Sequence, residues 1–271
     1  RADDAAAPAQ PREGLRRPPG GAGLAVGAGG GHHIEHGAGL REEGVGHGAG
    51  GGLQARQRGD ALVALGDLSP PRLLAAYRRG IFPWFNDGEP ILWWSPDPRM
   101  VVFPDQVRIT RSLRKTLRKA NYEVRLDSDF PAVIRACAEA REPGGGTWIT
   151  PDIQAAYIRM HELGYAHSVE TWVDGELAGG LYGMALGRAF YGESMFSRRT
   201  DASKIAFAHL TRFLEQHDFR VLDCQMTTGH LASLGGREIA RELFVKMLDT
   251  LTRDGPPPAR WPQNGAQAPW A

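Results

Sequence analysis

The sequence predicts an α+β fold, and three observations support this class. From residue 61 onward, apolar residues recur with helical spacing in some segments and alternate with period two in others. Three strand-like runs follow one another and are separated by tight turns, of which Asp174 and Gly175 form a strong hairpin signal. Helical segments precede and follow these runs. This order is typical of an antiparallel sheet packed against helices.

The composition divides the chain near residue 60. Seventeen of the 35 glycines lie in residues 1–60, whereas none of the 23 aromatic residues does. A segment with so few large apolar side chains cannot offset the entropy cost of ordering its backbone. We therefore expect residues 1–60 to form a disordered low-complexity extension, and the folded part of the chain to begin at residue 61.

The overall composition is that of a cytoplasmic protein. Hydrophobic residues make up 42% and charged residues 23% of the 271 positions, and the formal net charge is +1. No run approaches the about 20 apolar residues of a membrane helix, and no secretion signal is visible, so we expect no membrane partner. Cys137 and Cys224 lack C-x-x-C spacing, which argues against a disulfide scaffold and against structural zinc.

The first helix is expected over residues 70–79, because Ser69 can cap it, Pro70 suits its first turn and Gly80 follows its end. A rigid aromatic and proline-rich loop follows it. Further helices are expected over residues 129–141, 151–163, 201–217 and 235–251, and strands over residues 168–173, 176–186, 189–196 and 219–226.

A basic helix is expected within residues 108–125, which carry seven Arg or Lys side chains and one acid, Glu123. Leu113 and Leu117 stand four positions apart, as on the buried face of an amphipathic helix. Surface helices usually mix acids with bases, so the pattern fits nucleic-acid contact as well as a simple solvated surface. The basic residues of this helix are Arg111, Arg114, Lys115, Arg118 and Lys119.

Polar residues end one of the expected buried strands. Alternation places Asp223 and Gln225 on one face, and burying both is costly unless they bind a ligand, each other or a loop backbone. Cys224 points to the opposite face, which argues against a cysteine nucleophile. Glu193, on the last strand of the meander, could bind a cation or could simply be solvated. We expect that strand to diverge from the strand of Asp223 and to open a cleft.

Glycines are dense within the expected meander, at positions 179, 180, 183 and 192. Glycine weakens a strand, so each needs a structural reason. Bulges, a ligand lying against the strands, and close packing of a helix are all compatible with this pattern.

Nine motifs, taken in order, resemble the leucyl/phenylalanyl-tRNA–protein transferase family. They are RLLAAYRRGIFPWF, PILWWSPDPR, TWIT, ELGYAHSVETW, LAGGLYG, FYGESMFS, ASKIA, LDCQ and HLASLG. The resemblance extends from about Leu65 to Leu251 and leaves the first 60 residues outside it.

The resemblance implies a small N-terminal α/β domain over residues 61–125 and a GNAT-like catalytic domain over residues 126–254, with a flexible tail over residues 255–271. It implies a monomeric cytoplasmic enzyme that moves Leu or Phe, with Met as a further candidate, from aminoacyl-tRNA to the N-terminal Arg or Lys of a protein. The product is an N-degron, which marks the protein for degradation. No metal and no soluble cofactor is implied.

The resemblance also implies roles for individual residues. Gln225 orients the attacking amine, Asp223 polarises this arrangement, and Glu193 and Asp223 supply negative charge near the basic N-terminus of the acceptor. Trp84 and Trp148 stack near the terminal adenosine, and the five basic residues named above hold tRNA phosphates. The aminoacyl side chain is received by Leu181, Gly192, Met195, Phe207, Leu210 and Leu222.

Three other functions share some of these features. An N-acyltransferase that uses acyl-CoA has the same fold class, but no phosphate-binding R-x-x-G-x-G/A loop follows the meander. A catalytically inert RNA-binding module explains the basic helix and the aromatic residues but not the polar pair. An aminoacyl-tRNA-dependent transferase could instead act on a cell-wall peptide or a lipid.

Overall fold

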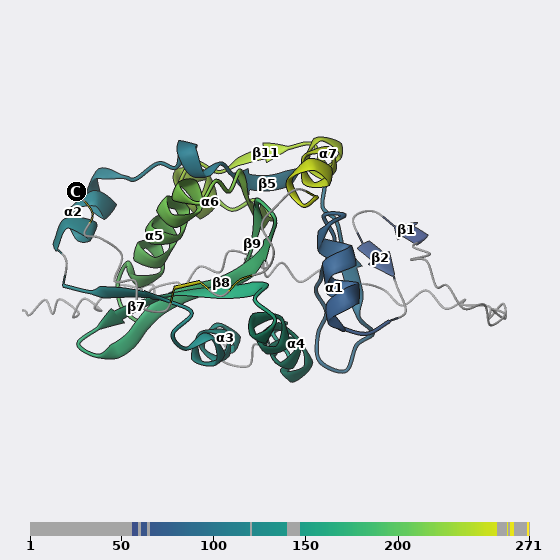
Figure 1. The fold of residues 1–271 in the computed structure, drawn as a ribbon, viewed down its shortest axis with the longest axis horizontal. Coiled ribbons are helices and arrows are strands. Elements are labelled where there is room, and N and C mark those ends of the chain that lie inside the picture. Colours follow the sequence, from purple (N-terminus) through teal and green to yellow (C-terminus); the bar gives the residue numbers. More distant parts are fainter. Residues whose placement is uncertain are drawn as a thin grey trace, which may run out of the picture.

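A seven-stranded mixed sheet forms the centre of the molecule (Figure 1). The computed structural model describes residues 56–58, 61–63, 66–119, 121–139, 147–253, 259, 261, 262 and 270. The strand order of the sheet is β11-β5-β10-β9-β8-β7-β6. Its strands are β5 (Arg99–Val102), β6 (Glu123–Leu126), β7 (Ala166–Val173), β8 (Glu176–Leu186), β9 (Ala189–Ser197), β10 (Val221–Gln225) and β11 (Arg237–Ile239).

Helices cover both faces of this sheet, with α5 on one face and α3 and α4 on the other (Figure 1). The first core packs residues of α1, α3, α4 and α7 against the sheet. The second core packs residues of α2, α5 and α6 against it. The helices are α1 (Pro70–Tyr77), α2 (Arg111–Lys119), α3 (Phe130–Ala138), α4 (Pro151–Glu162), α5 (Ala202–Gln216), α6 (Gly229–Ser233) and α7 (Arg241–Leu251), with a 3-10 turn at Pro104–Gln106.

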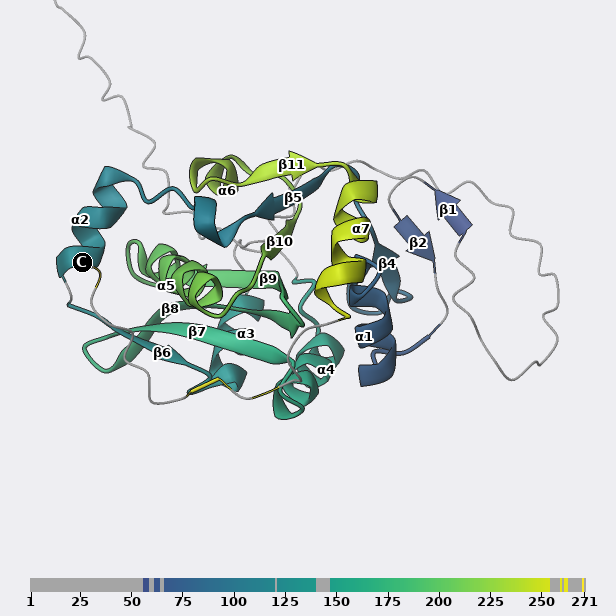
Figure 2. The same ribbon diagram turned by 45° about the horizontal axis from the view of Figure 1, so that its top comes forward.

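A second, small sheet lies at one end of the molecule beside α1, and α7 packs next to this helix (Figure 2). Its strand order is β1-β2-β4-β3. The strands are β1 (Arg56–Arg58), β2 (Ala61–Val63), β3 (Phe82–Pro83) and β4 (Leu92–Trp94). Of residues 1–60, expected to be disordered, the structure describes only β1; the rest lies outside the described residues.

The expected α+β class and the antiparallel meander are confirmed. β7 pairs with β8 and β8 with β9, both antiparallel. Asp174 and Gly175 have φ values of 55° and 79°, as a tight hairpin turn requires. The helix expected over residues 151–163 begins as predicted, since the hydroxyl of Thr150 accepts a hydrogen bond of 3.3 Å from the N–H of Ile153.

The structure corrects two expected elements. The segment expected to be an aromatic loop after α1 contains β3 and β4. These two strands pair in antiparallel fashion, with Phe82 opposite Trp94. The helix expected over residues 235–251 begins only at Arg241, because Arg237–Ile239 form β11 against the edge of β5. Strand pairing between distant segments therefore overrides local helical propensity here.

The large sheet also takes in residues 99–102 and 123–125, which the sequence analysis placed in the N-terminal domain. β5 pairs with β10 and β11, and β6 pairs with β7. Segments on both sides of residue 126 thus form one sheet. None of the described helices combines the length and the hydropathy of a membrane-spanning segment.

Candidate active site

Strands β9 and β10 part immediately after Tyr191 and Asp223. The parallel pairing of the two strands covers only Val221–Asp223 against Ala189–Tyr191. Beyond this point β9 continues to Ser197 in pairing with β8, while β10 continues beside β5. The divergence expected from the sequence is therefore present, and the polar residues named above gather around it.

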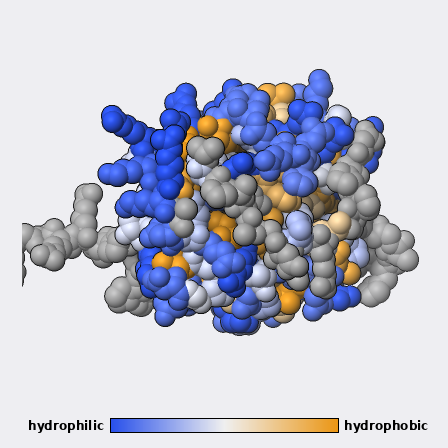
Figure 3. Space-filling view, turned by 60° about the vertical axis from the view of Figure 1, so that its left-hand side comes forward, coloured by the Kyte–Doolittle hydropathy of each residue, from blue (hydrophilic) through white to orange (hydrophobic). Residues whose placement is uncertain are grey.

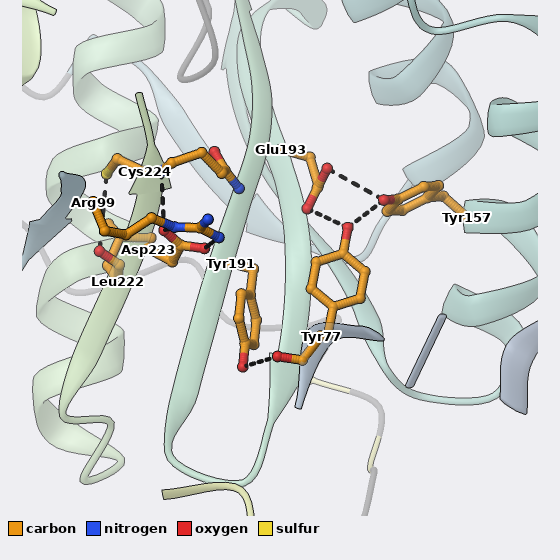
Figure 4. Close-up of polar contacts among 9 residues, drawn as sticks. Tyr77, Arg99, Tyr157, Tyr191, Glu193, Leu222, Asp223 and Cys224 are labelled. Atoms are coloured by element: carbon orange, nitrogen blue, oxygen red, sulfur yellow. Dashed lines mark hydrogen bonds and ion pairs between the residues drawn. The ribbon is translucent and has the colours of Figure 1, made fainter. Parts of the chain in front are cut away.

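Asp223 forms a buried ion pair with Arg99, the first residue of β5. The Nε and Nη2 atoms of Arg99 donate hydrogen bonds of 2.8 and 2.7 Å to the two carboxylate oxygens (Figure 4). The two side chains are 1% and 0% exposed. The rings of Phe82 and Phe244 lie 5.1 and 4.8 Å from the guanidinium carbon. This bidentate geometry fixes the carboxylate in position.

The pairing with Arg99 changes the role expected for Asp223. The sequence analysis expected this carboxylate to supply negative charge to the acceptor N-terminus. In the structure its charge is balanced by Arg99, and its Oδ1 atom also accepts a hydrogen bond of 2.9 Å from the backbone N–H of Gln225. Asp223 thus holds the backbone of Gln225, whereas Glu193 forms no ion pair within the described part of the chain.

Gln225 has a strained backbone and an unpartnered side chain. The register against β5 shifts between Asp223 and Gln225, so regular alternation ends at Asp223. Gln225 adopts φ 55°, which costs a non-glycine residue about 1–2 kcal/mol. Its side chain is 1% exposed, yet neither amide atom has a hydrogen-bond partner among the described residues. Buried amides are normally satisfied, so the amide of Gln225 has hydrogen-bonding capacity that no described residue uses.

A β-bulge positions Glu193 beneath two tyrosines. Tyr182 lies opposite Ser194 and Gly183 lies opposite Gly192, so Glu193 is the extra residue of the bulge. A Cβ atom at Gly183 would lie 2.2 Å from the carbonyl oxygen of Tyr191, which explains the glycine at this position.

The carboxylate of Glu193 is held by hydroxyl groups. Tyr77 of α1 donates a hydrogen bond of 2.6 Å to Oε1, and Tyr157 of α4 donates one of 3.3 Å to Oε2 (Figure 4). The two hydroxyl groups also contact each other. Tyr191, two residues before Glu193, donates a hydrogen bond of 3.0 Å to the backbone carbonyl of Tyr77. Helices α1 and α4 are thereby joined to the point where β9 and β10 part.

Burial raises the pKa of Glu193 from 4.5 to about 8, because desolvation outweighs the hydrogen bonds from the tyrosines. The pKa values of Tyr77 and Tyr157 are also raised well above 10, first by desolvation and then by the charge of Glu193. Both tyrosines therefore remain hydrogen-bond donors. The site holds an acid whose charge depends on pH near neutrality and on any cation that enters.

The residues expected to receive the aminoacyl side chain share one core. Five of them are fully buried members of the second core: Leu181, Met195, Phe207, Leu210 and Leu222. The sixth, Gly192, is buried at the bulge. Glu193 and Tyr191 lie on the other side of the sheet, with the first core. The point where the strands part thus has apolar residues on one side and a carboxylate on the other.

The aromatic residues expected to contact tRNA are partly exposed, and the basic residues lie on the surface. Trp84 and Trp148 are half-buried against the first core. The five basic residues of α2 are exposed, and none pairs with a carboxylate within the described chain. Leu113 and Leu117 are buried beneath them, as the amphipathic pattern predicts. Hydrophilic side chains dominate this side of the molecule (Figure 3).

Cys224 lies on the opposite side of β10 from the ion pair, in the second core. Burial raises the pKa of its thiol well above 9, so the thiol stays protonated and is a poor nucleophile. Among the described residues, no group of three His, Cys, Asp or Glu side chains is arranged to hold a metal ion.

Sequence reasoning missed Arg99, Tyr77 and Tyr157. A signal for Arg99 was present, because a charged residue directly precedes the buried apolar run of β5. Tyr77 and Tyr157 stand among the buried residues of α1 and α4, and a tyrosine ring fits an apolar core as well as a polar site. Only the structure brings their hydroxyl groups to Glu193.

The models of one known protein family match most of this chain. A family model described as leucyl/phenylalanyl-tRNA protein transferase matches residues 101–249, and the N-terminal domain model of the same family matches residues 66–97. A solved GCN5-related N-acetyltransferase from Kribbella flavida is 12% identical, with a TM-score of 0.36, over 63% of this chain and 61% of that chain.

Two bacterial relatives carry the name leucyl/phenylalanyl-tRNA–protein transferase. The protein from Azoarcus sp. is 70% identical over 200 residues, which cover 74% of this chain and 85% of the relative. The protein from Aromatoleum aromaticum is 63% identical over 209 residues, which cover 77% and 88%. The chain therefore belongs to the leucyl/phenylalanyl-tRNA–protein transferase family.

Proposed function

We propose that this aminoacyltransferase moves Leu or Phe from aminoacyl-tRNA onto the N-terminal Arg or Lys of acceptor proteins in the cytoplasm. The observation that carries this proposal is the buried, unpartnered amide of Gln225 at the point where β9 and β10 part. This amide offers an acceptor and two donors between an apolar core and a buried acid. Such a site suits an amine that attacks an ester.

The reaction needs orientation more than chemical activation. In an aminoacyl ester, the amine nitrogen attacks the carbonyl carbon, the new C–N bond forms, and the bond to the ribose oxygen of tRNA breaks. The proton lost by the amine is taken up by the departing ribose oxygen. An α-amino group has a pKa of about 7.7–8.0 and is partly neutral at pH 7, so an acceptor that aligns it can suffice.

Gln225 is the group that aligns this amine. Its Oε1 atom accepts a hydrogen bond from the amine, which turns the nitrogen lone pair toward the ester. Arg99 acts on this step through Asp223, whose Oδ1 atom holds the backbone N–H of Gln225. Arg99 and Asp223 are thus positioning residues, and the left-handed backbone of Gln225 is maintained by their ion pair.

Glu193 meets the positive charge of the acceptor N-terminus. A cation that approaches a buried carboxyl group favours its ionised form. Binding of an N-terminal Arg or Lys is thereby coupled to loss of the proton from Glu193. An acceptor with a neutral first side chain provides less positive charge, so this arrangement selects basic N-termini.

The donor is held by its side chain and by its tRNA. The apolar second core receives Leu or Phe, with discrimination of about 1–3 kcal/mol for each methylene group. Trp84 and Trp148 stack near the terminal adenosine. The basic surface of α2 binds phosphates.

Transfer of radiolabelled Leu from Leu-tRNA to peptides that differ only in their first residue tests this function. We expect transfer to a peptide beginning with Arg but not with Ala, and a loss of about 100-fold with Gln225→Ala. Gln216→Ala, which removes an exposed amide from α5, is the matched control and should retain activity. Binding of tRNA without transfer would instead indicate an inert RNA-binding module. Transfer from acyl-CoA would indicate an N-acyltransferase, and transfer to a lipid or a cell-wall peptide would indicate a different acceptor class.

Replacing Arg114 and Lys115 of α2 with Gln is expected to weaken tRNA binding and its dependence on salt. For each phosphate that the variant no longer binds, the slope of log affinity against log salt concentration should fall by about one. The measurement is a titration with Leu-tRNA at several salt concentrations. Arg159→Gln, on the surface of α4, is the control. An unchanged slope would show that α2 does not bind phosphate.

A further inference from the structure

Trp261, near the C-terminus, is built into the second core. Its side chain is 8% exposed, although the sequence analysis expected a flexible tail over residues 255–271. Its ring stacks on His167 with centroids 4.2 Å apart and an angle of 4° between the planes. It also contacts the rings of Phe213 at 4.4 Å and Phe190 at 5.7 Å. Three elements, β7, β9 and α5, therefore meet at this indole.

A buried carboxylate fixes the position of Trp261. The backbone N–H of Trp261 donates a hydrogen bond of 3.2 Å to Oδ2 of Asp127. The same oxygen accepts a hydrogen bond of 2.8 Å from Nδ1 of His167, and Oδ1 accepts one of 2.8 Å from the N–H of Ser168. Asp127 is 2% exposed. Asp127 thus orients the histidine on which the indole stacks and also holds the backbone of the tryptophan.

Two of the rings that Trp261 contacts are neighbours of residues of the proposed donor pocket. Phe190 is opposite Leu222 in the pairing of β9 with β10. Phe213 follows Leu210 by one turn of α5, on the same buried side. Trp261 touches both phenylalanines and belongs to the same core as the pocket residues. Its contacts with Phe190 and Phe213 therefore connect it to the residues of the proposed pocket.

We propose that Trp261 sets the depth of the donor pocket and thereby the preference between Leu and the larger Phe. The inference rests on the proposed function, since it assigns the second core to the donor side chain. Protein interiors are close-packed, so Phe190 and Phe213 cannot retreat while the indole is in place. Removing it leaves a cavity into which they can move. The space gained favours the bulkier donor.

A purely structural role for Trp261 predicts a different result. Loss of packing alone would lower the activity with both donors by the same factor. A role in pocket depth changes the ratio of the two activities. The informative quantity is therefore the ratio of kcat/KM for Phe-tRNA to kcat/KM for Leu-tRNA, measured beside the unfolding midpoint of each variant.

The experiment compares Trp261→Ala and Trp261→Phe with Trp270→Ala in the full chain. Trp270 also lies near the C-terminus but is only partly buried, and its ring lies beside His209 and Arg212 at the edge of the second core. We expect the ratio to rise about tenfold in Trp261→Ala and by a smaller factor in Trp261→Phe. Trp270→Ala should leave the ratio unchanged.

An unchanged ratio in a folded Trp261 variant would overturn the inference, and Trp261→Phe decides the matter if the alanine variant does not fold. A rise of the same size in Trp270→Ala would also overturn it, because the effect would then belong to the tail as a whole. Failure of the proposed function is distinguishable, since the wild-type chain would then transfer neither amino acid.

Discussion

Arg99→Met is expected to destabilise the fold by about 3–5 kcal/mol, because it leaves the carboxylate of Asp223 buried without its counter-charge. The side chain of Asp223 is 0% exposed, so water cannot replace the guanidinium. The methionine fills much of the space between the rings of Phe82 and Phe244. The free energy of unfolding, from denaturant titrations at pH 7, measures the effect.

The double variant Arg99→Met with Asp223→Asn separates loss of the charge from loss of packing. The asparagine side chain at position 223 is neutral and still offers an oxygen to the N–H of Gln225. Most of the stability lost in Arg99→Met should therefore return in the double variant. Arg159→Met is the surface control. In the wild type, Nη1 of Arg159 lies 2.8 Å from Oε2 of Glu162, but both side chains are more than half exposed. We therefore expect the free energy of unfolding to change by at most about 1 kcal/mol. Equal losses of stability in Arg99→Met and Arg159→Met would contradict the conclusion that burial makes the Arg99–Asp223 pair important.

Glu193→Gln is expected to become more stable relative to the wild type as the pH rises from 4.5 to 8. Folding raises the pKa of Glu193 from 4.5 to about 8, so the folded state binds more protons than the unfolded state within this range. Wild-type stability from this group is therefore fully present below pH 4.5 and decreases until pH 8. Glutamine does not titrate between pH 4.5 and pH 8, so this position adds no pH dependence to the stability of the variant. The gap between variant and wild type should widen by up to about 5 kcal/mol.

Denaturant unfolding of both proteins at intervals between pH 4 and pH 9 measures this gap. Glu242→Gln, which removes an exposed carboxylate from α7, controls for the loss of one formal charge. A constant gap for Glu193→Gln across the range would show that Glu193 is ionised in the folded protein at neutral pH. The two tyrosines would then bind a permanent anion.

Local patterns predicted much of the fold. The turn at Asp174 and Gly175 and the alternation around it specify the meander through contacts between neighbours in the sequence. The pairing of β5 with β10 and β11 joins segments that are far apart, and no local pattern reports it. For the same reason β11 was assigned to a helix. Its residues Arg237–Ile239 take strand geometry only because the edge of β5 is available.

The candidate site was predicted where polarity conflicted with burial. Asp223 and Gln225 stand out because an acid and an amide end an apolar strand, and Glu193 because it follows apolar and glycine residues. Their partners come from other elements, and the strained backbone of Gln225 follows from a register shift that only the assembled sheet contains. The pairing of Asp223 with Arg99 therefore could not be read from the sequence.

The place of β5 in the large sheet has a consequence for synthesis on the ribosome. Val102 pairs with Leu222, 120 positions further along the chain. While the nascent chain emerges, the edges of β5 therefore remain unpaired until β10 has left the exit tunnel. Until then Arg99 also lacks the carboxylate of Asp223. The candidate site therefore cannot form stepwise from the N-terminus. A chain released before β10 keeps an open edge on β9, which is the kind of surface that promotes aggregation.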